Sequence, residues 1–346
     1  MNTTANANPG ADPAAAGQPV SFTLRAVDGY PLAAMRYAAQ GAERGRLIVA
    51  GATGVPQGFY RRFAQFAAAH GYTVLTLDYR GIGASRSGSL RGFRASFLDW
   101  GRLDLAAAVD HMADDGATAG ASAAPGAATA PRAATTSAAA SAANAGAAPR
   151  AGRVPLYMVG HSYGGHAFGL LPNHGKVDGL YTFATGAGWH GWMPRLERVR
   201  VLLMWNVVAP LLTRWKGCLA WSKLGMGEDL PLGVYRQWKH WCGYPHYFFD
   251  DPKMRDVTDG FNDVRAPIMA VNAADDLWAP PGSRDAFMRG YRNAPWFGID
   301  IDPAKSGIGK IGHMGYFRPQ AQALWVAALD WFDGIGARSP AAHPPV

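Results

Sequence analysis

Residues 157–169, YMVGHSYGGHAFG, place the pentapeptide GHSYG (160–164) directly behind an apolar run. A Gly-x-Ser-x-Gly pattern alone is a weak signal, because a chain with 43 glycines contains it about 0.2 times by chance. The flanks strengthen it: an apolar strand comes before Ser162, and a helix start, GGHAFGLL, comes after it. In that strand–turn–helix setting a tight turn exposes the serine hydroxyl, and small flanking residues let the two backbones approach. The motif therefore predicts a nucleophilic Ser162 rather than a structural turn serine, with His161 pointing the other way into packing.

Short apolar stretches alternate with helical segments on both sides of this motif. Strands are expected within 21–29 and 32–40, which resemble a hairpin, and within 46–54, 72–85, 154–160, 179–188, 266–276 and 296–302. Helical spacing of apolar residues marks 59–71, 96–113 and 319–336. The alternation predicts an α/β fold with a mainly parallel central sheet and helices on both of its faces.

Low-complexity segments set the limits of the predicted domain, which runs over 20–336. Residues 1–19 and 337–346 are expected to be tails, the first of them disordered. Residues 114–153 are almost all Ala, Gly, Ser, Thr and Pro, a composition that buries too little apolar surface to order itself. Because the alternation of strands and helices continues beyond this tract, it is expected to be a disordered loop insertion within one domain.

Residues 189–265 break the alternation and are expected to form a helical lid. They hold seven tryptophans: Trp189, Trp192, Trp205, Trp215, Trp221, Trp238 and Trp241. These rings are expected to form the core of the lid, or an apolar pocket that closes over Ser162. The run VLLMWNVVAPLL (201–212) is too short to span a membrane, which takes about 20 residues. Arg195, Arg198 and Arg200 beside it are expected to be a solvated helix face rather than a lipid contact.

A serine nucleophile needs a base, and the base needs a carboxylate to orient it. ADDLWAPP (274–281) puts Asp275 and Asp276 at the end of a predicted strand, where sites in open α/β sheets form. IGKIGHMGYFR (308–318) puts His313 in a glycine-rich loop before the last helix. The three side chains are expected to meet at the carboxyl edge of the sheet.

These motifs resemble the α/β-hydrolase superfamily, whose triad runs nucleophile, acid, histidine along the chain. The likeness is greatest to uncharacterised bacterial α/β-hydrolases near the serine-aminopeptidase-like and monoacylglycerol-lipase-like branch. Residues 78–85, DYRGIGAS, also look like the D-x-R-G-x-G-x-S turn of that family. The resemblance implies the triad Ser162, Asp276 and His313. Asp276 is preferred because the family acid precedes a proline by four positions, and Asp275 is the alternative.

The same resemblance implies an oxyanion hole. The family often has His-Gly after its third strand, and this chain has AGATG (50–54) instead. Because a backbone amide does the work, loss of that histidine is compatible with activity. By position, the amides of Ala52 and Tyr163 are expected to form the hole, with the Thr53 hydroxyl as an additional donor.

Composition excludes several other classes of function. The net charge of +8 is scattered rather than gathered in a basic stripe with aromatics, so nucleic-acid binding is not expected. The AGATG turn lacks the Lys-Ser/Thr of a phosphate-binding loop. Cys218 and Cys242 are the only cysteines, which favours a reduced cytosol over a disulfide scaffold. No secretory signal, metal site or organic cofactor is expected, and the predicted location is cytoplasmic.

The sequence thus predicts a serine hydrolase that cleaves a carboxylic ester of a small acyl substrate, with a thioester or amide as further options. Two alternatives stay open at this point. One is a non-catalytic binding or scaffold protein on the same fold, because fold does not guarantee activity. The other is an acyltransferase that uses the same triad. Dehalogenase chemistry is disfavoured, because that branch has aspartate in place of Ser162.

Overall fold

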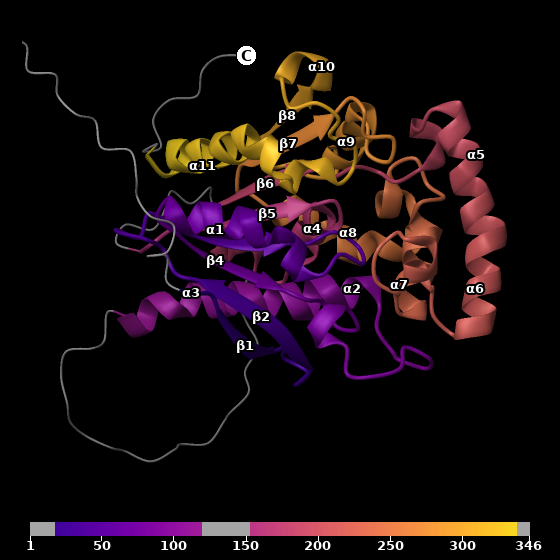
Figure 1. Cartoon of the computed structure of the whole chain (residues 1–346), viewed down its shortest axis with the longest axis horizontal. Helices are drawn as coiled ribbons and strands as arrows, with labels where there is room; N and C mark the ends of the chain where they lie inside the picture. Colours follow the sequence, from indigo (N-terminus) through magenta and orange to yellow (C-terminus); the bar gives the residue numbers. More distant parts are fainter. Residues whose placement is uncertain (1–17, 120–152, 338–346) are drawn as a thin grey trace, which may run out of the picture.

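The computed structural model describes residues 18–119 and 153–337, and all structural statements below concern these residues (Figure 1). Its strands are β1 (Val20–Arg25), β2 (Pro31–Tyr37), β3 (Gly45–Ala50), β4 (Tyr72–Leu77), β5 (Leu156–His161), β6 (Gly179–Phe183), β7 (Ile268–Ala273) and β8 (Trp296–Ile301). They form one sheet in the order β1-β2-β4-β3-β5-β6-β7-β8. The β1–β2 and β2–β4 pairs are antiparallel and the other neighbours are parallel, so the predicted mainly parallel sheet is confirmed, as is the predicted hairpin.

Helices connect most of these strands. They are α1 (Arg61–Ala69), α2 (Phe97–Asp99), α3 (Ala106–Ala119), α4 (Tyr163–Ala167), α5 (Arg195–Leu203), α6 (Ala209–Lys216), α7 (Leu232–Trp241), α8 (Arg255–Asp263), α9 (Pro281–Met288), α10 (Pro303–Ser306) and α11 (Gln322–Ala337). Two stretches wind as wider π turns, Trp100–Leu105 and Met204–Val208.

The two faces of the sheet are covered by different helices. Side chains alternate along β3, so that Leu47 and Val49 join one buried cluster while Ile48 and Ala50 join the other. The first cluster contains the buried sides of α1 and α11, and the second contains those of α3, α8 and α9. Figure 1 shows α1 and α11 on one side of the strands and α3 on the other. Helices therefore lie on both faces, as the sequence predicts.

Strand register brings distant parts of the chain to one edge of the sheet. Gly160 at the end of β5 lies opposite Ala50 at the end of β3, and His161 lies opposite Phe183 at the end of β6. β7 runs parallel to β6 and ends at the same edge. The loops that follow these strands are therefore neighbours in space.

The boundaries of the predicted low-complexity loop are partly wrong. α3 continues to Ala119, so residues 114–119 belong to a helix rather than to the loop predicted over 114–153. Alanine favours helix, and composition alone does not mark where the helix stops. Residues 120–152 lie outside the described residues, as does most of both predicted tails, at 1–17 and 338–346. α11 ends at Ala337, the first residue of the predicted C-terminal tail.

The region 189–265 is built from α5, α6, α7 and α8, joined by the π turn and by loops with short 3-10 turns, with one isolated bridge between Leu219 and Leu230. In Figure 1, α5 and α6 form a continuous column at the outer edge of the molecule. Four rings pack against one another, starting from Trp205 on the buried side of this column, and we call them the tryptophan cluster: Trp205, Trp221, Trp238 and Trp278. No helix in the described part of the chain is long and apolar enough to cross a bilayer.

Candidate active site

Ser162 lies in a strained turn between β5 and α4. Its backbone has φ 52° and ψ −106°, a conformation that non-glycine residues rarely adopt. Its amide donates to the Phe183 carbonyl at 2.9 Å, which ties the turn to β6. A Cβ on Gly164 would lie 2.0 Å from the Ala50 carbonyl oxygen, so only glycine fits where the helix passes β3. A Cβ on Gly160 would lie 2.6 Å from the Gly165 amide nitrogen, so both glycines of the motif are required by close backbone approaches.

His313 joins Ser162 to Asp276. Its Nε2 lies 3.0 Å from the Ser162 hydroxyl oxygen, and its Nδ1 lies 2.9 Å from Asp276 Oδ2 and 3.1 Å from Oδ1. With Asp276 ionised, Nδ1–H donates to the carboxylate and Nε2 is left to accept the hydroxyl proton. The structure thus brings the three predicted side chains within hydrogen-bonding reach of one another.

Asp276 is held ionised inside the protein. It is fully buried, and burial opposes its charge; His313 and the amides of Ala279 and Trp278 outweigh that effect and hold the pKa of the carboxyl below its ordinary value. Both amides donate to Oδ1 at 3.0 Å. The carboxylate is therefore fixed in position and in charge beside the imidazole.

Asp275 has a different set of contacts. Its two oxygens accept hydrogen bonds from the amides of Ile311 and Gly312, each at 2.9 Å. These residues directly precede His313, and Gly312 has a φ of 54°. Asp275 thus holds the loop that carries the histidine, while its neighbour Asp276 contacts the ring.

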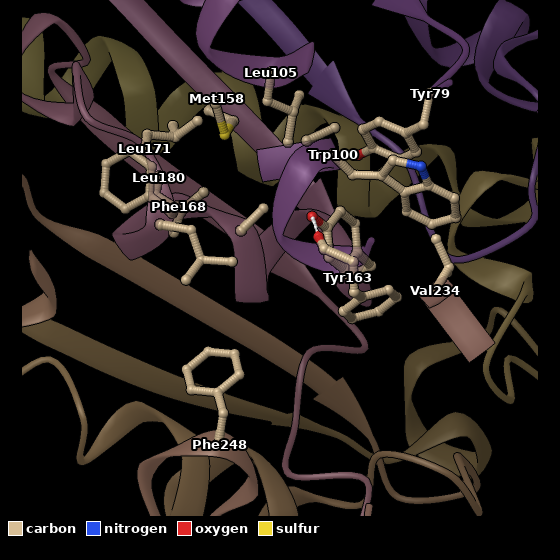
Figure 2. Close-up of a cluster of buried hydrophobic side chains, with 14 of the residues drawn as sticks. Tyr79, Trp100, Leu105, Met158, Tyr163, Phe168, Leu171, Leu180, Val234 and Phe248 are labelled. Carbon is tan, nitrogen blue, oxygen red and sulfur yellow. Dashed lines mark hydrogen bonds between the residues drawn. The ribbon is translucent and has the colours of Figure 1, made fainter. Parts of the chain in front are cut away.

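Tyr163 follows the serine and begins α4. The first amide of a helix has no partner inside the helix, so it is available to a developing negative charge. The side chain is fully buried: its hydroxyl donates to the Phe97 carbonyl at 2.6 Å, and its ring meets those of Tyr79 and Trp100 edge-on. Figure 2 shows this ring packed beside Trp100 and Tyr79. Anchoring of the side chain fixes the direction of the Tyr163 amide.

Ala52 is placed at the end of β3, but its amide already has a partner. It donates to the Tyr60 hydroxyl oxygen at 2.7 Å. The donor expected in the oxyanion hole is therefore occupied in this structure. The neighbouring Thr53 is partly exposed.

A buried chain of hydrogen bonds runs from this turn to the histidine loop. His161 Nε2 lies 2.9 Å from the His313 carbonyl oxygen, which can only accept, so Nε2 carries the hydrogen. Nδ1, 3.0 Å from the Tyr60 hydroxyl, then accepts from it. Burial, with the nearby His313, lowers the pKa of His161 to about 3, so the ring stays neutral. Sequence reasoning missed Tyr60 and assigned His161 to packing alone.

The DYRGIGAS turn supports the site without reaching it. Asp78 Oδ2 accepts from the Ala84 amide at 3.0 Å and so closes the turn on itself. Arg80 forms ion pairs of 2.7 Å with the buried Asp104 and with Asp28. Burial is the main cause that raises the pKa of Asp104 to about 6. The Tyr79 hydroxyl donates to the Gly51 carbonyl at 3.0 Å, so the motif supports the turn that carries Ala52.

Aromatic rings lead from the site into the region 189–265. The ring of Trp278, two residues after the acid, lies 6.3 Å from that of His313, and Trp238 lies 6.1 Å beyond it. Trp278 Nε1 also donates to Glu197 on α5 at 3.2 Å. The histidine thus has an apolar wall beside it, built partly by a residue the sequence analysis did not single out.

Other reactive groups lie elsewhere. Cys218 and Cys242 are both buried and unpaired. Within the described ranges, no group of three or more His, Cys, Asp or Glu side chains is arranged to hold a metal ion.

Solved structures with similar architecture are numerous, although no protein-family model and no curated protein matches the sequence. A soluble variant of monoglyceride lipase from Saccharomyces cerevisiae superposes with a TM-score of 0.59 at 15% identity, covering 94% of this chain and 97% of that one. The acylaminoacyl peptidase of Pyrococcus horikoshii gives 0.55 at 11% identity over 95% of this chain and 43% of that one. An esterase from Thermogutta terrifontis gives 0.50 at 15% identity over 93% and 100%. Their shared architecture shows that the chain has the α/β-hydrolase fold.

Proposed function

We propose that the protein is a serine hydrolase that cleaves a carboxylic ester of a small acyl substrate through an acyl-enzyme on Ser162. The observation that carries the proposal is the 3.0 Å approach of His313 Nε2 to the Ser162 hydroxyl, with Asp276 on the other ring nitrogen. A hydroxyl becomes an effective nucleophile only beside such a base. A structural turn serine needs neither partner.

In the proposed reaction His313 takes the Ser162 proton as the hydroxyl oxygen attacks the acyl carbon. Asp276 orients the ring and stabilises its charged form. The proton then passes from Nε2 to the departing alkoxide, and the acyl group stays on the serine. Water, activated by the same nitrogen, attacks the acyl carbon in a second step and restores the free serine. No metal or organic cofactor takes part in the proposal.

The Tyr163 amide is the first proposed donor to the oxyanion. The Ala52 amide is the second, and it serves when its hydrogen turns from the Tyr60 hydroxyl to the substrate oxygen. Thr53 lies in the same turn and is proposed as an additional contact. The region 189–265 is proposed to act as the lid, and a cytoplasmic location is proposed from the two free cysteines.

The test is Ser162→Ala with p-nitrophenyl esters as substrates. Turnover is expected to fall on the order of 10⁵-fold, because the covalent step is lost. The circular dichroism spectrum should stay unchanged. Ser87→Ala, at an exposed serine, is the matched control and should keep full activity. Unchanged turnover in Ser162→Ala overturns the proposal.

Two other functions of the same fold are separated by this experiment. A fluorophosphonate probe labels only an activated serine, so failure to label the wild type points to a binding protein. Ester or amide products that appear on addition of an alcohol or an amine point to acyl transfer.

A further inference from the structure

The column formed by α5, the π turn at Met204–Val208 and α6 has two apolar faces. Its inner face is buried through Val201, Trp205 and Ala209, which are at most 5% exposed. Its outer face carries six apolar side chains whose exposed fractions run from 47% to 65%: Leu196, Val199, Leu203, Val207, Leu211 and Trp215. An ordinary surface helix is apolar on one face only. The outer apolar face is covered by no described residue.

The six residues form a single stripe. They are spaced by three residues and then by four, the spacing of neighbours along one side of a helix. Four successive steps of four residues would carry the stripe about 160° around a regular α-helix. The π turn closes i→i+5 hydrogen bonds and has more residues per turn, so it reduces that rotation. It thereby keeps Val207, Leu211 and Trp215 in line with Leu203.

Positive charge borders the stripe. Between 195 and 216 the column carries five basic residues and one acidic residue. The basic residues are Arg195, Arg198, Arg200, Arg214 and Lys216. Arg198 is half-buried and donates to the carbonyls of His190 and Gly191, and Arg200 lies 3.5 Å from Glu197, so the border consists mainly of Arg195, Arg214 and Lys216. The acidic one, Glu197, is turned inward: its side chain is 14% exposed and accepts a hydrogen bond from Trp278. At the end of the column, Lys216 Nζ lies 3.8 Å above the exposed Trp215 ring.

We propose that this outer face docks on an anionic lipid surface. An apolar stripe between basic side chains is the pattern that places a helix in the plane of a bilayer with its charges at the headgroups. A second copy of the chain is the less suitable occupant, because two such faces would bring basic residues together with no exposed acidic partner. The inference concerns binding and is independent of the proposed activity.

The apolar stripe is tested by sedimentation of the full chain with vesicles. One set is phosphatidylcholine alone, and the other contains about 30% phosphatidylglycerol. The wild type is expected to sediment with the anionic set only. Leu203→Gln combined with Leu211→Gln keeps helix propensity and removes apolar surface, so binding should fall on the order of 10-fold. Phe297→Gln, an equally exposed apolar position on β8, is the matched control and should bind as the wild type does.

The charges are tested in the same assay. Arg195→Gln combined with Arg214→Gln should lower binding to the anionic vesicles roughly 30-fold, about 5-fold for each charge. Arg62→Gln combined with Arg292→Gln removes two exposed charges elsewhere and should leave binding within about 2-fold. This pair of variants separates a local basic border from the net charge of the chain.

Three results would overturn the inference. The first is wild-type chain that stays in the supernatant with anionic vesicles. The second is equal binding by the stripe variant and the wild type. The third is a wild-type chain that is a dimer in sedimentation velocity while the Leu203→Gln, Leu211→Gln variant is a monomer. That result would show that the stripe binds a second copy of the chain rather than a lipid surface.

Discussion

The carboxyl edge of the sheet and the tryptophan cluster are held together mainly by different kinds of contact. At the edge, Asp276, His313 and Ser162 are fixed by directional hydrogen bonds of 2.9–3.1 Å. In the region 189–265, the rings of Trp205 and Trp238 meet at 5.0 Å through apolar contact alone, and the buried Trp205 Nε1 has no hydrogen-bond partner among the described residues. Hydrogen bonds fix atoms in place, whereas apolar packing mainly fills volume.

This difference predicts that the two regions affect different kinetic properties. Substitutions at the edge should change the rate for every substrate, because the side chains proposed to react lie there. Substitutions in the tryptophan cluster should change which acyl chains are accepted, because rings beside the site set its shape and apolar area. The following experiments test that contrast.

The largest effect is expected from Asp276→Asn. An amide cannot hold the imidazole in the tautomer that accepts the serine proton, so kcat should fall on the order of 10⁴-fold for short and long esters alike. Asp275→Asn is the matched control, because it leaves the Asp276–His313 contact in place and weakens only the loop hydrogen bonds. The kcat of Asp275→Asn should fall roughly 10-fold. The reverse order of effects would make Asp275 the acid.

An intermediate effect concerns stability in acid. The unfolded chain takes up a proton on residue 161 near the ordinary pKa of 6.5, whereas the folded chain resists protonation down to about 3. Stability conferred by the neutral ring is therefore lost as pH falls below 6.5, by about 2 kcal/mol between pH 7 and pH 5. Urea unfolding at both pH values should show that loss reduced in His161→Gln. His70→Gln, at an exposed histidine, should keep the wild-type pH dependence. Equal losses in all three proteins would show that residue 161 is not buried as a neutral ring.

The smallest effect is expected in the tryptophan cluster. Trp238→Leu should raise KM for a long-chain p-nitrophenyl ester by about 5-fold, because it removes apolar surface beside Trp278. Hydrolysis of the acetate ester should stay within about 2-fold. Trp215→Leu, on the outer face of the same region, should leave both the KM for the long-chain ester and the hydrolysis of the acetate ester unchanged in vesicle-free solution. A uniform loss over all chain lengths would erase the contrast between the two regions.

Much of the fold could be predicted because strand and helix periodicities are local. The proximity of Ser162, Asp276 and His313 was also predictable, since each follows a strand that ends at the same edge. The Tyr60 contact with Ala52 was not, because it depends on how the turn after β3 directs a side chain eight residues away.

The exposed stripe on α5 and α6 could not be predicted from the sequence for another reason. Apolar spacing predicts that a face is covered, and the inner residues Val201 and Trp205 have the same four-residue spacing as Leu203 and Val207 outside. Pro210 lies in the first turn of α6, directly after the π turn, where its missing amide is tolerated.

The bonds that join Ala52, Tyr60, His161 and the His313 carbonyl have a mechanical consequence. Tyr60 is the shared partner of the amide and the inner imidazole, so a displacement that frees one necessarily alters its bond to the other. The Ala52 turn and the loop that carries His313 are thereby coupled to each other through the protein interior. If a substrate draws the Ala52 amide toward its carbonyl oxygen, as proposed, the change would reach the main chain of His313 before any proton has moved.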